Sequence, residues 1–561
     1  MSAEWSRRAS PPILQRATLR RADWRFLLPT PSGGRFAHLV LLGGEAGLAA
    51  RLVEEGLAAR VDCAMTDTIT ADAMVALHDA DIDPDEFTRH LPANCPLYIE
   101  VDRRRPGRRW LTPARLCARL QAGGATIIGV YWAKPHFDAC EMLLPLEARR
   151  ALAWYLETLY VPRSAGRRLL GVLLRTLSRV GTPAFGPFAP CYAVAALGEP
   201  GVALRGAATP LGIPITASGR PGAHSLLITS ADDERSRVVV LPFAGRGARP
   251  ALTLKAARRV AQRGHTEGEQ LALTAIHAVL DAPLRTTIPQ PLALLHRGGE
   301  LVAAQGIAAG RCFSAVSGRW AGLPGPKRDG LRRVADWLAD FHEQTQIARP
   351  IWDREQASRW IAAPLDAYVG TFGFHHGEAR LFAAARARAA DLLGLRLPIV
   401  WQHHDLHESN VYLTGPDAGY GVTVIDWERA RHGPALADLL YFVKYWYYTV
   451  RGLRGEAAQL HGFRQLYLDA TPGERWGATG RAAIGRYLAR LDIAPAFLPL
   501  LLTVSCAEHA LDWAERQREV VGAIPDGDPR AGNRWSAYLA LLAADPGRVF
   551  SPFPAARAVG R

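Results

Sequence analysis

Between Leu397 and Asp426, three polar side chains each follow closely on a short apolar run. The run that ends at Trp401 leads into a turn holding Asp405 and, five residues further on, Asn410. Two more apolar runs, separated by a turn rich in Gly, Pro and Asp, then lead to Asp426. Apolar runs spaced this closely predict a β-hairpin, which brings Asn410 and Asp426 to the same end of two adjacent strands.

These three side chains suit one reaction. A carboxylate beside a carboxamide oxygen offers the hard oxygen ligands that Mg²⁺ prefers. Asp405 is expected within reach of the same place but outside the metal shell. Phosphoryl transfer needs a carboxylate that orients and accepts the proton of an attacking hydroxyl, and oxygen ligands that hold the metal on the β- and γ-phosphates. The segment therefore meets the requirements of a phosphotransferase.

The same segment resembles a known family. The run H-x-D-L-H-x-x-N, from His403 to Asn410, is similar to the catalytic loop H-G-D-L-H-P-G-N of aminoglycoside phosphotransferases and of related choline-kinase-like enzymes. The run I-D-W-E around Asp426 is similar to their metal motif. Gly433 and Asp438 fit the G-x-x-x-x-D-L that follows it.

This resemblance implies a protein-kinase-like fold over residues 200–520 and gives each motif residue a role. Asp405 would be the catalytic base, and Asn410 and Asp426 would be the Mg²⁺ ligands, with ATP as phosphate donor. His403 and Asp438 would brace the loop.

Two positions of the loop depart from the family pattern. His404 stands where the family has glycine, and Glu408-Ser409 stands where it has Pro-Gly. Both departures lie between the functional side chains, so we expect an altered acceptor side and retained activity.

Lysine is rare in this chain, which singles out one strand. Of 67 basic residues only four are lysine, namely Lys134, Lys255, Lys327 and Lys444. Lys255 ends the apolar run that begins at Pro250, and Glu269 follows fourteen residues later on a predicted helix. In kinases a strand lysine binds the α- and β-phosphates, and a helix carboxylate fixes its position. The resemblance favours Glu269, with Glu267 as the alternative.

Two further nucleotide-binding features are predicted in this lobe. The best glycine-rich loop is Ser218–Gly222, which contains Gly219 and Gly222. The strand Leu301–Ile307 would be the hinge, and its backbone near Gln305 and Ile307 would hydrogen-bond adenine.

The N-terminal part alternates between strand and helix, which favours βαβ units. The strand His38–Leu42 ends in Gly43 and Gly44 and is followed by a predicted helix. This turn resembles the first motif of S-adenosylmethionine-dependent methyltransferases, but Glu45 stands where a second glycine is usual. Asp62 is the closest candidate for a ribose-binding acid. A degenerate, non-catalytic domain is favoured over an active one, and a plain α/β scaffold is the alternative.

These patterns predict a Rossmann-like α/β domain followed by an α+β bilobal protein-kinase-like domain. The segments are a loosely ordered basic N-terminus (1–35), the Rossmann-like domain (36–150), a helical connector (151–185), a β-rich nucleotide-binding lobe (186–310), a helical lobe with the catalytic loop and acceptor pocket (311–545) and a tail (546–561).

Composition narrows the partners and the compartment. The net charge of +14 is spread along the whole chain, and no nucleic-acid-binding motif accompanies it, so no specific nucleic-acid partner is expected. The connector has apolar and basic residues on opposite sides, which is compatible with contact to a membrane surface. Seven scattered cysteines without a C-x-x-C pair indicate a reducing compartment, and we expect the cytoplasm.

The sequence thus predicts an ATP- and Mg²⁺-dependent kinase that phosphorylates a hydroxyl group of a small molecule. Two alternatives stay open: a pseudokinase scaffold that binds nucleotide without turnover, and a bifunctional enzyme whose N-terminal domain binds S-adenosylmethionine. The acceptor, the oligomeric state and any protein partner are not predicted.

Overall fold

The computed structural model separates the chain into two compact units. Unit 1 comprises Met1–Gln270 and Pro291–Ile307, and unit 2 comprises Leu271–Gln290 and Ala308–Arg561. The structure describes residues 19–29, 34–45, 47–65, 70–81, 83–160, 165–180, 189–199, 223–229, 237–244, 249–297, 300–317, 324–415, 421–469, 474–521 and 530–550.

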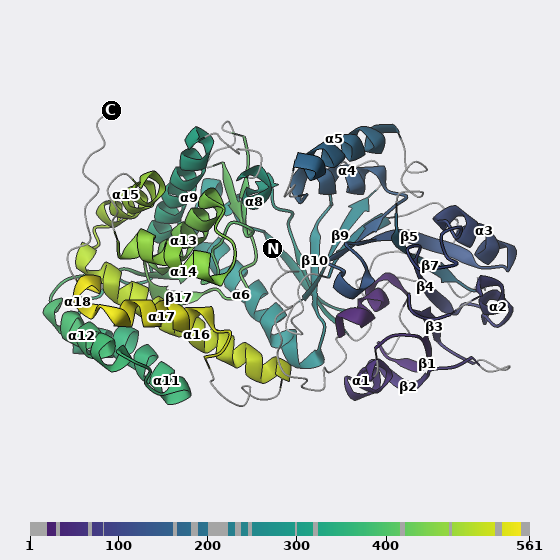
Figure 1. The fold of residues 1–561 in the computed structure, drawn as a ribbon, viewed down its shortest axis with the longest axis horizontal. Coiled ribbons are helices and arrows are strands. Elements are labelled where there is room, and N and C mark those ends of the chain that lie inside the picture. Colours follow the sequence, from purple (N-terminus) through teal and green to yellow (C-terminus); the bar gives the residue numbers. More distant parts are fainter. Residues whose placement is uncertain are drawn as a thin grey trace. The chain divides into compact units, whose positions relative to one another are not determined.

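Unit 1 is built on one 12-stranded sheet with the order β11-β12-β10-β9-β8-β6-β5-β7-β4-β3-β1-β2 (Figure 1). Its strands are β1 (Phe36–Leu42), β2 (Ala58–Asp62), β3 (Ala73–Ala76), β4 (Pro96–Asp102), β5 (Thr126–Lys134), β6 (Met142–Pro145), β7 (Cys191–Leu197), β8 (Ala223–Ile228), β9 (Arg237–Ala244), β10 (Thr253–Ala257), β11 (Pro291–Arg297) and β12 (Glu300–Gln305).

The sheet is mixed. The strands β1, β2, β3 and β4 run parallel to their neighbours among these four, whereas the other pairs are antiparallel. The predicted βαβ pattern therefore describes only one end of the sheet, and the Rossmann-like assignment is not confirmed.

The two β-rich segments expected as separate domains share this sheet. β7, which follows the predicted boundary near residue 186, lies between β4 and β5 and pairs with both. β8 pairs with β6, with Leu227 opposite Leu143. The sheet therefore crosses that boundary, because a strand from the expected second segment completes the first.

Two hydrophobic cores cover the two faces of the sheet. Successive residues of a strand point to opposite faces. On β7, Ala193 and Ala195 join one core while Val194 and Ala196 join the other. The first core also includes Val302 of β12, so it extends from the N-terminal strands to the far end of the sheet.

The N-terminal segment packs into that core. Leu19–Leu27 forms a 3-10 helix, η1, whose Trp24 and Phe26 are buried. Asp23 of η1 and Arg258, which follows β10, form an ion pair at 2.8 Å in which both side chains are almost fully buried. The prediction of a loosely ordered stretch up to residue 35 is therefore wrong for this segment, because its spaced apolar side chains find a core that only the folded sheet provides.

The helices of unit 1 are α1 (Leu48–Glu54), α2 (Pro84–Arg89), α3 (Pro113–Ala122), α4 (Arg149–Thr158), α5 (Ala165–Val180) and the first part of α6 (Arg263–Val279). α3 shows how the sequence sets a helix start, since the side chain of Thr112 accepts a hydrogen bond from the backbone N–H of Arg115 and Pro113 follows at the first position. α4 and α5 lie where the helical connector was predicted.

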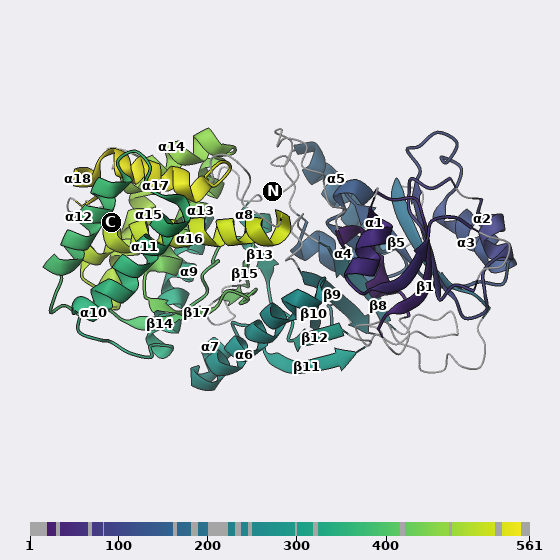
Figure 2. The same cartoon turned by 90° about the horizontal axis from the view of Figure 1, so that it is seen from below.

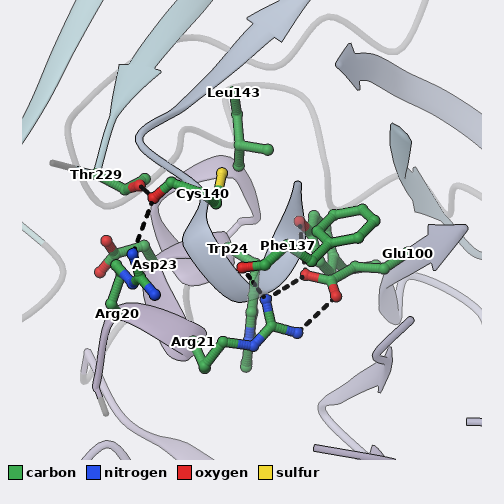
Figure 3. Close-up of a pocket in the computed structure, with 10 residues that line it drawn as sticks. Arg20, Arg21, Asp23, Trp24, Glu100, Phe137, Cys140, Leu143 and Thr229 are labelled. Atoms are coloured by element: carbon green, nitrogen blue, oxygen red, sulfur yellow. Dashed lines mark hydrogen bonds and ion pairs between the residues drawn. The ribbon is translucent and has the colours of Figure 1, made fainter. Parts of the chain in front are cut away.

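A small cavity beneath η1 is closed by buried charges (Figure 3). Arg21 donates to Glu100 at 2.7 Å, and the two side chains are 6% and 2% exposed. Burial opposes both charges, but each partner stabilises the other, so the pKa of Glu100 is lowered and that of Arg21 is raised. The two buried charges therefore stabilise each other within the packed interior. None of the predicted site residues lines this cavity.

Unit 2 is mainly helical, with a large core and two small sheets (Figure 2). Its strands are β13 (Arg311–Cys312), β14 (Ile399–Gln402), β15 (Val411–Leu413), β16 (Val422–Val424) and β17 (Arg431–Pro434). Besides the end of α6, its helices are α7 (Ala282–Arg285), α8 (Phe313–Ser317), α9 (Pro324–Gln344), α10 (Arg354–Ala357), the π-helix η8 (Ser358–Ala362), α11 (Ala363–Phe372), α12 (Glu378–Asp391), α13 (Ala437–Arg451), α14 (Glu456–Tyr467), α15 (Arg475–Arg490), α16 (Leu498–Val521), α17 (Arg534–Ala544) and α18 (Pro546–Val549).

Candidate active site

The loop after β14 is held by a buried carboxylate. Asp438, at the start of α13, accepts the backbone N–H groups of His403 at 2.7 Å and of His404 at 2.8 Å. Burial would raise the pKa of Asp438, but the side chain of His342 and the backbone N–H of His403 lower it, so the carboxylate stays ionised. Asp438 thus fixes the backbone directly before Asp405.

His403 fixes the same loop with its ring. Its Nδ1 accepts the backbone N–H of Asp405 at 3.2 Å, so the proton of the neutral ring belongs on Nε2. Nε2 then donates to the carbonyl of Ile425 at 2.8 Å. The ring packs on Trp427, with 4.8 Å between the ring centroids. His403 therefore ties the Asp405 loop to the segment that carries Asp426.

The predicted hairpin is present and brings the two expected metal ligands together. β15 and β16 pair antiparallel, with Val411 opposite Val424. Beyond that pair, the backbone N–H of Ile425 donates to the carbonyl of Asn410 at 2.9 Å. Asn410 and Asp426 therefore lie at the same end of adjacent strands, as the spacing predicts.

The side chain of Asn410 and the backbone of Asp426 both have features that suit a metal site. The amide nitrogen of Asn410 donates to the backbone carbonyl of Asp405 at 3.0 Å, which turns the amide oxygen away from that bond. Asp426 adopts φ of +70°, a region that a non-glycine residue enters at a cost and that is common at functional sites. A carboxylate and an amide oxygen at one hairpin end form a donor set that fits Mg²⁺.

The carboxylate of Asp405 has a hydrogen-bond donor that the motifs do not include. The hydroxyl of Tyr441, on α13, donates to Oδ1 of Asp405 at 2.7 Å. The ring nitrogen Nε2 of His407 lies 3.9 Å from Oδ2. Tyr441 follows Asp438 by three residues on the same helix, so the helical period alone could have placed both on one face.

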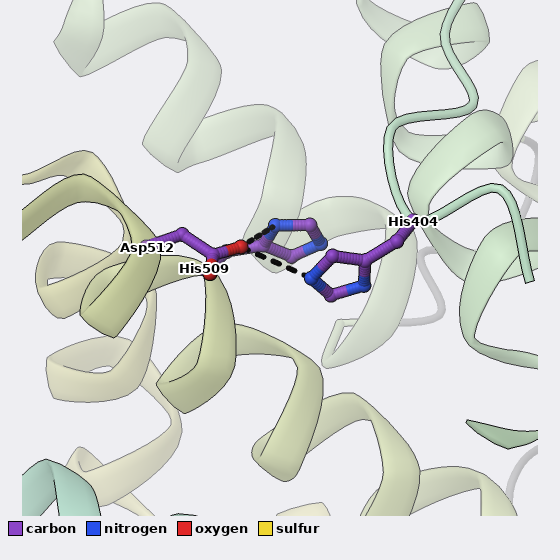
Figure 4. A group of neighbouring side chains, drawn as sticks. All are labelled: His404, His509 and Asp512. Atoms are coloured by element: carbon purple, nitrogen blue, oxygen red, sulfur yellow. Dashed lines mark hydrogen bonds and ion pairs between the residues drawn. The ribbon is translucent and has the colours of Figure 1, made fainter. Parts of the chain in front are cut away.

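His404, the residue that replaces the family's glycine, is part of a cluster with His509 and Asp512 (Figure 4). Its Nε2 lies 3.0 Å from Oδ2 of Asp512, and its ring stacks on that of His509 at 4.6 Å. These three residues have the types of a transition-metal site, with ligand atoms within 4.8 Å of one another. However, Arg429 donates to the same oxygen of Asp512 at 3.2 Å and would repel a cation. We interpret the cluster as a network that holds His404 at its φ of +61°.

In unit 1, the predicted lysine and carboxylate meet. Nζ of Lys255, on β10, lies 2.6 Å from Oε1 of Glu269, on α6. Arg237, on β9, binds the other oxygen of Glu269, a second cation that the sequence patterns do not reveal. Glu269 is fully buried, whereas Glu267 is exposed, so the structure selects Glu269 over the alternative.

The predicted hinge lies on β12 and just beyond it. Gln305 ends β12 opposite Thr253 of β10 and is buried, and Ile307 is half-buried. Gly219 and Gly222 lie outside the described residues. They precede β8, and the segment that joins β8 to β9 contains no glycine in its sequence.

The glycine turn after β1 is closed by the chain itself. The backbone N–H of Gly44 donates to both carboxylate oxygens of Asp79, at 2.8 and 2.9 Å. A Cβ on Gly43 would lie 2.6 Å from Asp79, so close packing within the chain accounts for this glycine. Asp62, the predicted ribose-binding acid, is paired with His38 at 2.8 Å and with Arg60 at 2.7 Å. The backbone N–H of Gly44 and the carboxylate of Asp62 are thus both bound by other groups of the chain.

A comparison with protein families identifies part of this chain. Residues 251–478 match the family described as the phosphotransferase enzyme family. The match contains the lysine strand, the Asp405 loop and the Asp426 segment, and these residues have the kinase-like fold of that family. No curated protein matches the chain.

Several solved structures are distantly similar. A microcompartment-associated aminopropanol kinase shares 14% identity over 60% of this chain and 96% of its own, with a TM-score of 0.32. An aminoglycoside phosphotransferase from Streptomyces rimosus, solved with ADP and streptomycin, shares 16% identity over 46% of this chain and 84% of its own, with a TM-score of 0.28. A choline/ethanolamine kinase family protein from Mesorhizobium loti shares 17% identity over 56% and 89%, with a TM-score of 0.30. At these identities and TM-scores the similarities carry no argument about function.

The family match agrees with the motifs from which a phosphotransferase was predicted, and that prediction is confirmed. Residues 251–478 are thus the part of this chain that is similar to the phosphotransferase enzyme family.

Proposed function

We propose that the chain transfers the γ-phosphate of ATP to a hydroxyl group of a small molecule, with Mg²⁺ as cofactor. The observation that carries this proposal is the hairpin end at which Asn410 and Asp426 lie side by side, tied through Asn410 to the backbone of Asp405. That arrangement places a base and a hard-oxygen donor pair on one rigid support.

Asp405 would orient the acceptor hydroxyl and accept its proton. Its Oδ1 is held by Tyr441, so Oδ2 is the oxygen that suits the acceptor. His403 and Asp438 would keep the loop in place by accepting backbone N–H groups of the loop, from Asp405 and from His403 respectively. Tyr441 is then a positioning residue, since it acts through Asp405.

Asn410 and Asp426 would hold Mg²⁺, which supplies charge neutralisation on the β- and γ-phosphates when bound. Lys255, kept in place by Glu269, would bind the α- and β-phosphates. The backbone near Gln305 and Ile307 would hold adenine.

The proposal is tested by incubating the full chain with ATP, Mg²⁺ and a panel of hydroxyl compounds that covers sugars, amino alcohols and aminoglycosides. Transfer of phosphate to one class, measured by ADP release and product mass, would support it. Binding of Mg·ATP with no acceptor phosphorylated and no ADP formed would favour a pseudokinase scaffold instead.

We further propose that the N-terminal half of unit 1 binds S-adenosylmethionine weakly or not at all. Glu45 places a bulky, negative side chain in the turn, and Asp79 binds the backbone N–H of Gly44 there. A cofactor at this turn would need backbone N–H groups that a carboxylate of the chain already occupies. Saturable micromolar binding to the full chain would instead favour a bifunctional enzyme.

We also propose that the connector contacts a membrane surface and that the protein is cytoplasmic. Among the described side chains of α5, Leu169, Leu170, Val172 and Leu173 are exposed, which gives the helix an apolar face. In the described residues no helix combines the length and apolar character that crossing a bilayer requires. All seven cysteines are free thiols, in keeping with a reducing compartment. Sedimentation with anionic vesicles tests the contact.

A further inference from the structure

One lysine of unit 2 is enclosed by aromatic rings. Lys444, on α13, is 2% exposed, and its Nζ donates no hydrogen bond among the described residues. Four ring centroids surround that nitrogen: those of Trp535 at 3.3 Å, Tyr445 at 4.4 Å, Tyr441 at 4.6 Å and Tyr538 at 5.1 Å. We refer to these four rings as the aromatic box.

Such a box is a binding site for an ammonium group. The faces of aromatic rings carry negative charge, and several rings around one point attract a cation without a hydrogen bond. Burial lowers the pKa of Lys444 well below its ordinary value, while the carboxylates of Asp405 and Glu408 act in the opposite direction. In either protonation state the side chain fills the centre of the box.

The box adjoins the proposed base. Tyr441 forms one wall of the box with its ring and donates its hydroxyl to Asp405 at 2.7 Å. Trp535, the ring closest to Lys444, stacks on His509 with 4.4 Å between centroids. His509 in turn stacks on His404, the neighbour of Asp405 in the loop. The enclosed lysine and the base therefore share one set of packed rings.

Two residues of this region are unusual in the sequence. His404 replaces a glycine of the motif, and Lys444 is one of only four lysines. The others are also engaged: Lys255 with Glu269, Lys134 with three rings and Lys327 with one ring, that of Trp476. A lysine surrounded by four rings next to the base is thus a specific feature of this site.

We propose that the side chain of Lys444 permanently fills the aromatic box beside Asp405, so that the acceptor is a neutral or anionic hydroxyl compound and not an organic cation. This assignment rests on the proposed function, since it concerns the acceptor of that reaction. An ammonium group of an acceptor would have to displace the side chain of Lys444 from the same rings.

Binding measurements test the box without any need for turnover. Isothermal calorimetry with ethylammonium and tetramethylammonium chloride is carried out on the wild type, Lys444→Ala, Lys444→Met and Lys327→Ala. We expect saturable binding of ethylammonium only by Lys444→Ala, in the millimolar range because the probe has so few atoms. Lys444→Met keeps the box filled with a neutral chain, and Lys327→Ala removes a lysine that faces a single ring.

Tight binding of either probe by the wild type would overturn the proposal, as would a folded Lys444→Ala that binds neither. Circular dichroism shows whether Lys444→Ala is folded. If it is not, thermal unfolding with and without ethylammonium replaces calorimetry, because a ligand of the emptied box raises the melting temperature of the variant and not that of the wild type.

An acceptor comparison then separates this proposal from the proposed function. Wild type and Lys444→Ala are supplied with matched sugars, glucose and glucosamine, under saturating Mg·ATP. We expect the wild type to prefer the neutral sugar and the ratio of kcat/KM values to shift at least 10-fold toward the amino sugar in the variant. If the wild type prefers the amino sugar, the proposal that Lys444 fills the aromatic box is wrong. Absence of phosphorylation of these sugars and of every other compound in the hydroxyl panel would count against the proposed function, while the binding result would still decide whether the box takes ammonium groups.

Discussion

The two ends of the sheet in unit 1 carry features that looked alike in the sequence, and the structure separates them. At one end, the glycine turn after β1 has its backbone N–H of Gly44 bound by Asp79. At the other end, Lys255 on β10 is paired with Glu269 on α6. Both had been predicted as parts of a nucleotide-type site. One is closed by the chain, and the other has the ion pair that kinases require.

The difference lies in where the partner comes from. Glu269 was part of the predicted pattern, because a strand lysine and a helix carboxylate belong to one motif. Asp79 lies 35 residues beyond Gly44 and belongs to no motif, so no sequence pattern predicts that its carboxylate binds the turn. A sequence pattern at the end of a strand therefore predicts a ligand site reliably only when it also includes the residues that bind the strand-end groups.

The largest expected effect concerns the link between the two ends. Asp23 of η1 pairs with Arg258, three residues after Lys255, and both are buried. Asp23→Ala should lower the free energy of unfolding by about 3–5 kcal/mol, because it leaves a buried guanidinium without its carboxylate. Chemical denaturation measures this, with exposed Arg60→Ala as control, for which we expect less than about 1 kcal/mol. A similar small loss for both variants would mean that the sheet does not depend on η1.

Removal of the proposed metal ligand Asp426 should have the next largest effect. Asp426→Ala should weaken Mg²⁺-dependent nucleotide binding by about 10²-fold or more, since loss of a supporting group alone already costs about 10- to 100-fold. Asn410→Ala should weaken it less, because one carboxylate remains. Calorimetry with and without Mg²⁺ measures both. Unchanged Mg·ATP affinity in Asp426→Ala would remove this residue from the metal site.

The lysine end of the sheet is tested by Lys255→Met. We expect the KM for ATP to rise roughly 10-fold or more, the cost of losing a hydrogen bond to a charged group. The fold should persist, because Arg237 still binds Glu269. Lys255→Arg should rescue only in part, since a guanidinium is larger and planar. Steady-state kinetics measures the KM for ATP, with Lys134→Met as the control variant. If Lys255→Met keeps the wild-type KM, as we expect for Lys134→Met, the assignment of Lys255 is wrong.

The smallest effect is expected at the closed turn. Asp79→Ala should leave phosphotransfer kinetics unchanged, because nothing assigns this turn to the reaction. The variant sharpens the comparison if it is also titrated with S-adenosylmethionine. Binding by the variant but not by the wild type would mean that Asp79 alone closes an otherwise competent site. Binding by the wild type would show that the turn is open.

The part of the site that could be predicted is the part that is local in sequence. The hairpin that joins Asn410 to Asp426 follows from short apolar runs and a turn, and the brace by Asp438 follows from a motif. The Lys255–Glu269 pair was found for the same reason. In each case the spacing along the chain sets the spacing in space.

What could not be predicted depends on long-range packing. Asp512 lies 108 residues after His404 in the chain, on α16, and no motif marks it. The insertion of β7 between β4 and β5 depends on strand pairing, and the sequence shows only that the run is apolar. The burial of Trp24 likewise depends on a core that exists only in the folded sheet. Such features come from tertiary contacts that local spacing does not contain.

The central claim is that Asp405 is the base of a phosphotransfer reaction, and the most direct measurement compares the wild type with Asp405→Asn under saturating Mg·ATP and acceptor. The account predicts nearly unchanged nucleotide affinity and a kcat lowered by about 10²-fold or more, because general-base assistance is worth that much. Wild-type-like turnover in Asp405→Asn would contradict it.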